Sequence, residues 1–225
     1  MPQVFYRVVL IFLALSFAQM AQAGPWLREK GSAFTAASFS STYYMETATQ
    51  TYLEYGLSDK TTVVADLGMA RLHYVENSGY ATVSLRRALS APDAQSKWAY
   101  ELGIGAGWIG STTLPHVRTG LSWGRGMEWG KKSGWMTVEA AVIWDLSDAH
   151  HVTKIDTTLG INFTEITSGM LQIYTANVVD QTFGTLAPSL IFNPKNSKFR
   201  IQIGAESQLG NWENSALKIG LWREF

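Results

Sequence analysis

Charged side chains of alternating sign recur along the chain, spaced so that neighbouring segments each contribute one or two. In chain order they are Asp66, Arg86, Glu101, Arg118, Glu139, Lys154 and Asp156, followed after two uncharged segments by Glu206 and Lys218. An isolated buried charge is costly, so such groups must be paired or solvated. If the segments are neighbouring strands, these residues would form ion pairs along one wall. The same wall could line a pore that selects solutes by charge.

Residues that would support nucleophilic chemistry are fewer. A lipid hydrolase needs a Ser or Asp nucleophile with a His base. The candidates are His73 or His151 with Ser78 or Ser147, and none of them lies in a recognisable motif. A lipid-modifying enzyme is therefore the weaker hypothesis, and it stays open.

Metal and cofactor sites have little support. The chain has no Cys, which removes thiolate ligands and disulfides. His150 and His151 are adjacent, so they should point to opposite faces of a strand, and no acidic ligand converges on them. The glycines in residues 103–107 have the period of a strand, whereas a phosphate loop turns into a helix. We expect neither a metal nor a cofactor.

Alternation of apolar and polar residues dominates from about Ser32 onward, which is the pattern of half-buried β-strands. Leu102 and Ile104, for example, share one face of a segment, and Glu101 and Gly103 share the other. Turn-rich clusters separate the segments at residues 41–44, 57–60, 76–79, 90–96, 111–115, 126–133, 146–150, 164–167, 179–181, 193–198 and 210–214. The pattern predicts an all-β fold of about twelve strands. Each strand has about ten residues, which is long enough for a tilted strand to cross a bilayer.

The N-terminal region has the features of an export signal. Arg7 precedes an apolar run at residues 8–17, and this run is shorter than the ~20 residues of a transmembrane helix. Ala21, Gln22 and Ala23 then form the small-x-small pattern of a cleavage site. We predict that residues 1–23 are a cleaved signal peptide and that residues 24–225 form a single domain.

The last segment places Leu217, Ile219, Leu221 and Phe225 on one face. An amphipathic strand that ends on an aromatic residue resembles the C-terminal signature of bacterial outer-membrane β-barrels. Residues 55–61 are similar to the hairpins of small porin-like proteobacterial barrels. The resemblance implies a closed antiparallel transmembrane β-barrel of the bacterial outer membrane, in contact with its lipids, with both ends on the periplasmic side. It also implies that the outer-membrane insertion machinery reads Phe225 as an assembly signal.

Three features favour a membrane barrel over a soluble one, which would reverse the two faces. The polar face is rich in glycine, which is poor material for a soluble surface. Aromatic residues near the strand ends are typical of an interfacial girdle: Trp98, Trp135, Phe163, Phe199 and Trp222. The apolar face is almost free of charge, and its expected lipid-facing residues are Leu102, Ile104, Leu121, Val138, Val142, Ile201, Ile203, Ile219 and Leu221.

The composition limits the classes of function that the chain can have. Charged residues make up 16% of the chain, below the ~25% of ordinary soluble proteins, and 18 basic residues balance 18 acidic ones. A balanced charge argues against a nucleic-acid partner, which requires a basic surface. The sequence predicts a narrow channel for small solutes with the charged residues lining its lumen. The alternatives are the lipid-modifying enzyme and a structural or interaction barrel with a blocked lumen.

Overall fold

The computed structural model describes residues 24–73, 75–130, 132–147, 150–178, 181–195 and 197–225. The expected signal peptide, residues 1–23, lies outside them. Within the described residues, twelve strands follow one another in chain order. They are β1 (Ala33–Thr42), β2 (Thr47–Ser58), β3 (Thr61–Leu72), β4 (Val75–Ala88), β5 (Ser96–Ile109), β6 (Thr112–Trp129), β7 (Lys132–Asp145), β8 (His151–Asn162), β9 (Thr167–Val178), β10 (Gln181–Phe192), β11 (Phe199–Gln208) and β12 (Asn211–Glu224).

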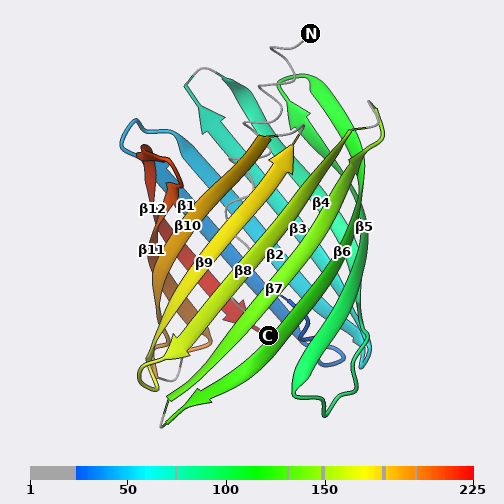
Figure 1. The fold of residues 1–225 in the computed structure, drawn as a ribbon, viewed down its shortest axis with the longest axis vertical. Coiled ribbons are helices and arrows are strands. Elements are labelled where there is room, and N and C mark those ends of the chain that lie inside the picture. The colour runs from blue at the N-terminus through cyan, green and yellow to red at the C-terminus, as the bar shows by residue number, and fades with distance from the viewer. Residues whose placement is uncertain (1–23, 74, 131, 148–149, 179–180, 196) are drawn as a thin grey trace.

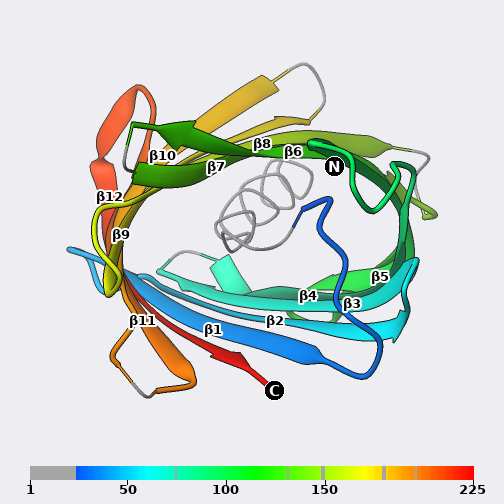
Figure 2. The ribbon, with the colours of Figure 1, turned by 90° about the horizontal axis from the view of Figure 1, so that it is seen from below.

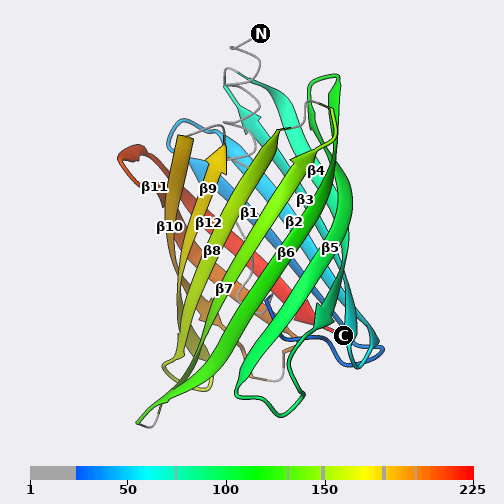
Figure 3. The ribbon, with the colours of Figure 1, turned by 45° about the vertical axis from the view of Figure 1, so that its right-hand side comes forward.

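Each strand pairs antiparallel with its neighbours in the chain, and β12 returns to pair with β1 (Figure 1). The closing ladder runs from Phe34 opposite Glu224 to Thr42 opposite Ala216. Seen along its axis, the sheet forms a complete ring (Figure 2). The strands run obliquely to the long axis of the barrel, as closure of a sheet requires (Figure 3). The expected closed antiparallel barrel of about twelve strands is confirmed.

Closure has a physical consequence for the backbone. A closed sheet has no edge, so its N–H and C=O groups are paired within the protein, as a hydrocarbon surrounding demands. β1 begins and β12 ends side by side, since Ala33 and Phe225 exchange backbone hydrogen bonds. We call this side of the barrel the Ala33–Glu224 end. Among the residues that the structure describes, no helix is long and apolar enough to cross a membrane.

The two faces of the sheet follow the expected parity. In β5 the outward Leu102 and Ile104 are 55% and 70% exposed, whereas Glu101 and Gly103, which alternate with them, are buried. The other residues expected to face lipid are likewise exposed or half-exposed. An apolar exterior around a polar interior is the inverse of a water-soluble barrel. The barrel is therefore built to span a bilayer.

Four expected turns are displaced into strands, and those at 111–115 and 210–214 lie almost entirely within β6 and β12. The cluster at 76–79 lies inside β4, where Ser78 and Gly79 pair with Ala70 and Met69. The cluster at 126–133 is divided between two strands, with residues 126–129 at the end of β6 and residues 132–133 at the start of β7. Glycine is an ambiguous turn signal because it also occurs in strands where a neighbouring ring needs space: a Cβ on Gly79 would collide with the indole of Trp108.

Apolar side chains also gather inside the barrel near the Ala33–Glu224 end. The cluster consists of Phe34, Ala36, Tyr52, Val64, Met170, Ile191 and Trp222, with Trp135 packed against it. The expected aromatic girdle is thus wrong for two of its members. Trp222 is 1% exposed and has the inward parity of Gly220 and Lys218, and Trp135 packs inward as well.

Candidate functional site in the barrel interior

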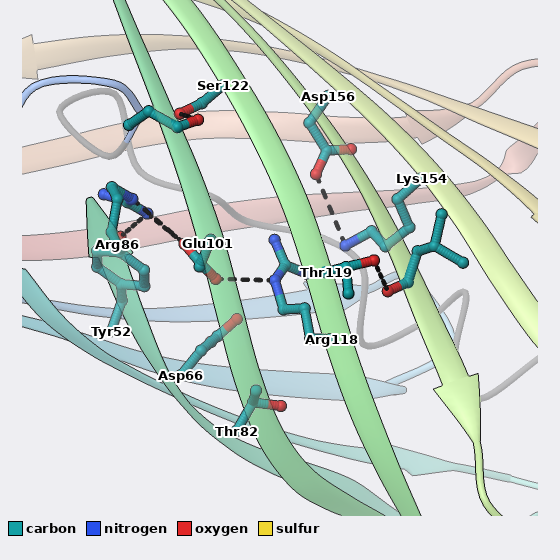
Figure 4. A network of polar contacts seen from close by, with 12 residues as sticks. Tyr52, Asp66, Thr82, Arg86, Glu101, Arg118, Thr119, Ser122, Lys154 and Asp156 are labelled. Carbon is teal, nitrogen blue, oxygen red and sulfur yellow. Dashed lines mark hydrogen bonds and ion pairs between the residues drawn. The ribbon is translucent and has the colours of Figure 1, made fainter. Parts of the chain in front are cut away.

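Arg86 on β4 is the centre of a buried ionic network (Figure 4). Its side chain is 2% exposed, and it lies directly opposite Glu101 in the β4–β5 ladder. Nε and Nη2 donate to Oε2 of Glu101 at 3.2 and 3.0 Å. Nη1 donates to Oε1 of Glu54 at 2.5 Å, and Nη2 donates to the Tyr52 hydroxyl at 2.9 Å. The guanidinium therefore has hydrogen-bond partners on both sides of its own strand.

Glu101 extends the network to the next strand. Its Oε1 accepts a hydrogen bond from Nε of Arg118 on β6 at 2.9 Å, so one carboxylate bridges two guanidinium groups. Glycines make room for these long side chains, because Arg118 lies opposite Gly103 and Glu101 lies opposite Gly120. The expectation that Arg86 and Arg118 each have a carboxylate on a neighbouring strand is met.

The expected pairing of Asp66 with Arg86 is wrong. Asp66 accepts hydrogen bonds at 3.0 Å from the amide of Gln50 and the hydroxyl of Tyr80. The register explains this, because Arg86 lies opposite Thr62 and Asp66 lies four residues farther along β3. At ~3.3 Å per residue that separation is about 13 Å, too far for a direct ion pair.

Glu54 takes the place expected for Asp66, and the sequence analysis missed it. The signal was present, since Glu54 shares its parity on β2 with the inward Gln50 and Tyr52. Its side chain is fully buried. A carboxylate in such a position needs a cationic partner, because burial removes its hydration.

The remaining charged candidates also lie on the inner wall. Lys154 and Asp156 both belong to β8, and Nζ of Lys154 lies 3.6 Å from Oδ2 of Asp156. Glu139 lies opposite Asp156 in the β7–β8 ladder, so the expected alternation of sign between neighbours is wrong at this point. Across the barrel, Lys218 on β12 donates to Glu206 on β11 at 2.7 Å, as expected.

The expected assembly residue lies where the barrel closes. The Phe225 N–H donates to the Ala33 carbonyl at 2.9 Å. Its ring is exposed and lies against the Arg223 guanidinium, 4.3 Å from Cζ to the ring centroid. Phe225 thus continues the β1–β12 pairing.

The candidate residues for lipid hydrolysis do not share one environment. Ser78 is 1% exposed and donates to the Ala70 carbonyl, so it does not face lipid as a lipid hydrolase would require. His151 is exposed and its ring lies against Trp144. Within the part of the chain that the structure describes, no group of three or more His, Asp or Glu side chains is arranged to hold a metal ion.

A cavity of about 630 Å³ opens near the Ala33–Glu224 end. Its lining combines the Trp135 and Trp222 rings with polar groups that include Asn162, Asn193 and Arg200. Arg200 forms an ion pair there with Glu224, with 3.1 Å between Nη2 and Oε1. This end of the barrel therefore has a polar and aromatic vestibule.

Comparison with solved structures finds similar barrels. No family model and no curated protein matches the chain. Among solved structures, the KdgM porin in complex with disordered oligogalacturonate matches with a TM-score of 0.60 at 8% identity, covering 86% of this chain and 99% of that one. The COG4313 outer membrane channel from Pseudomonas putida F1 matches with a TM-score of 0.60 at 13% identity, covering 92% and 100%. The NanC porin matches with a TM-score of 0.54 at 10% identity, covering 86% and 98%.

These likenesses concern the fold. The chain has the fold of small, porin-like bacterial outer-membrane β-barrels. Because one fold serves several functions, the function has to be argued from the interior of the barrel.

Proposed function

We propose that this protein is a channel of the bacterial outer membrane through which small polar solutes pass along a narrow, charge-lined lumen. The observation that carries the proposal is the Arg86–Glu101–Arg118 network on the inner wall. An interior built only for stability favours apolar packing, since replacing buried ion pairs by apolar residues is often neutral or stabilising. A wall that keeps charges of both signs is suited to contact with polar solutes and water.

The size of the barrel fits this role. Eight-stranded barrels are filled by their own side chains, and barrels of 16 to 18 strands hold a wide aqueous channel. Twelve strands lie between these limits. The long side chains of Arg86, Glu101 and Arg118 would then set the width of the lumen, and the vestibule would form its periplasmic mouth.

The similar structures support a channel, because two of them are porins and the third is an outer membrane channel. Oligogalacturonate, bound by one of them, is acidic. The interior here carries both signs of charge, so we propose small polar solutes in general as its cargo.

Conductance in planar lipid bilayers tests the proposal. The purified protein should produce stepwise, long-lived increases in ion current, and heat-denatured protein should produce none. Absence of steps from protein that runs as a folded, heat-modifiable barrel would contradict the channel function.

A barrel with a blocked lumen is the second candidate, and one observation favours it. The apolar cluster around Phe34 and Trp222 fills part of the interior near the Ala33–Glu224 end. The same bilayer experiment separates the two candidates, because a blocked barrel inserts without conducting.

We also propose that the outer-membrane insertion machinery recognises the final strand. The support is the alternating, outward-facing series Leu217, Ile219 and Leu221, which leads to the exposed ring of Phe225. The surrounding lipids would then contact this same surface.

A further inference from the structure

The segment that precedes β1 turns into the barrel. In Figure 2 it runs inside the ring of strands before joining β1. Its Arg28 N–H donates to Oγ1 of Thr62 on β3 at 3.0 Å. Gly56 on β2 allows the close approach, because a Cβ there would collide with the backbone carbonyl of Glu29.

The same segment reaches the other side of the interior. The rings of Pro25 and Trp26 cover Gly124 on β6, where an added Cβ would come within 2.8 and 2.7 Å of them. A Cβ on Gly24 would lie 3.2 Å from the Thr137 side chain and 3.4 Å from a Glu139 oxygen, both on β7. Residues 24–28 therefore extend from the β2–β3 wall to the β6–β7 wall.

Arg28 anchors the segment in a site suited to a planar cation. Its Nε lies 2.6 Å from Oε2 of the fully buried Glu54. Its guanidinium carbon lies over the Phe34 ring, 4.5 Å from the centroid. Phe34 and Glu54 are direct cross-strand partners, so the sheet itself fixes this combination of carboxylate and aromatic face. Both groups attract guanidinium ions.

The surrounding charge favours a cation at this place. The buried part of the inner wall from β2 to β8 carries five carboxylates (Glu54, Asp66, Glu101, Glu139 and Asp156) and three basic residues of its own (Arg86, Arg118 and Lys154). Counting formal charges, the wall alone has 3 − 5 = −2, and Arg28 brings it to −1. Withdrawal of Arg28 would therefore leave a more acidic lumen.

We propose that residues 24–28 are a gate across the lumen, and that the Glu54–Phe34 site holding Arg28 recognises small solutes that carry a guanidinium group. Such a solute takes the place of Arg28, and the segment then withdraws. The bound solute occupies the wall between β1 and β2, so the centre of the lumen is freed. This inference rests on the proposed channel function.

Single-channel recording with arginine as the probe tests the gate. Citrulline is the matched control solute, because it replaces the guanidinium group with a neutral ureido group. Arginine should raise the ion conductance of the wild-type protein in a saturable manner, and citrulline should not. Equal effects of the two solutes would overturn the proposal.

A variant pair tests the role of Arg28. Arg28→Gln should conduct several-fold more than the wild type without arginine, and arginine should add no further increase. Lys30→Gln is the matched control, because Lys30 is exposed and two residues farther along the same segment. It removes the same charge and should behave as the wild type. If Arg28→Gln matches the wild type, the gate is disproved while the channel function stands. If neither protein conducts, both proposals fail.

A reversible cross-link provides a second test. A Cβ at Gly24 would lie 3.6 Å from Cβ of Thr137, within the ~3.5–4.5 Å span of a disulfide. The chain has no other cysteine. In the oxidised Gly24→Cys/Thr137→Cys protein, arginine should no longer raise the conductance, and reduction should restore its effect. Gly24→Cys alone controls for strain, since Gly24 has a φ of 119°. Failure to form the cross-link, or arginine sensitivity that persists after oxidation, would overturn the gate.

Discussion

Arg86 on β4 binds Glu54 on β2 by reaching past the intervening strand β3, with 2.5 Å between Nη1 and Oε1. The β3 residue opposite Arg86 is Thr62, whose short side chain leaves the path open. Glu54 also binds Arg28 through its second oxygen. A single buried carboxylate therefore connects the ionic network of the wall to the segment that crosses the lumen.

Loss of Arg86 should destabilise the barrel. Arg86→Ala would remove one of the two cationic partners of Glu54 and one of the two of Glu101, and the full loss of a buried partner, about 3–5 kcal/mol, is the upper bound of the cost. Unfolding by urea in lipid vesicles would measure the loss. The control is Arg87→Ala at the next residue, which is exposed and should change the free energy of unfolding by less than about 0.5 kcal/mol. Equal effects of the two variants would show that the network contributes nothing specific.

A charged side chain at the centre of the outward face should destabilise the barrel in lipid. Leu102 is 55% exposed near the middle of β5. Leu102→Arg should lower the free energy of unfolding in lipid by about 2–4 kcal/mol. Leu89→Arg, at an exposed position just beyond the end of β4, should cost only about 0–1 kcal/mol. A cost at Leu102 no larger than that at Leu89 would mean that this surface does not lie in lipid.

Deletion of Phe225 should impair assembly. The Phe225 N–H closes the ladder with Ala33, and its exposed ring completes the apolar series of β12. The deletion should lower the folded, heat-modifiable fraction in outer membranes and leave export to the periplasm intact. Phe225→Tyr, which keeps the ring, is the control and should assemble as the wild type. Normal insertion of the deletion variant would contradict recognition of Phe225 by the insertion machinery.

The sequence predicted the barrel because alternation is a strictly local signal. Parity assigns Leu102 to lipid and Glu101 to the interior without knowledge of the partner strand. Pairing depends on register, which alternation does not encode. This is why Asp66 was expected to meet Arg86 but lies about four residues away along β3.

The residues missed by the sequence analysis have related causes. Glu54 belongs to a segment whose limits were poorly marked by turn residues, so its inward parity was not used. Trp222 was assigned to the girdle by its position near a strand end, although its parity is inward. The inward turn of residues 24–28 carries no periodic pattern. It depends on tertiary contacts such as that of Arg28 with Glu54.

Pore width and ion preference should respond to the loss of both wall guanidinium groups. Arg86→Ala combined with Arg118→Ala removes two long side chains from the lumen and leaves Glu101 without either cation. The conductance should rise, and the reversal potential in a salt gradient should shift toward that of a cation-selective pore.

Arg125→Ala is the control, because Arg125 is exposed near the end of β6 and binds Gln95 instead. Only the folded, heat-modifiable fraction should be reconstituted, since the double variant is expected to be less stable. Unchanged conductance and ion preference would leave the network a structural role alone, because a charged group that lines the narrowest part of a pore cannot be removed without altering the passage of ions.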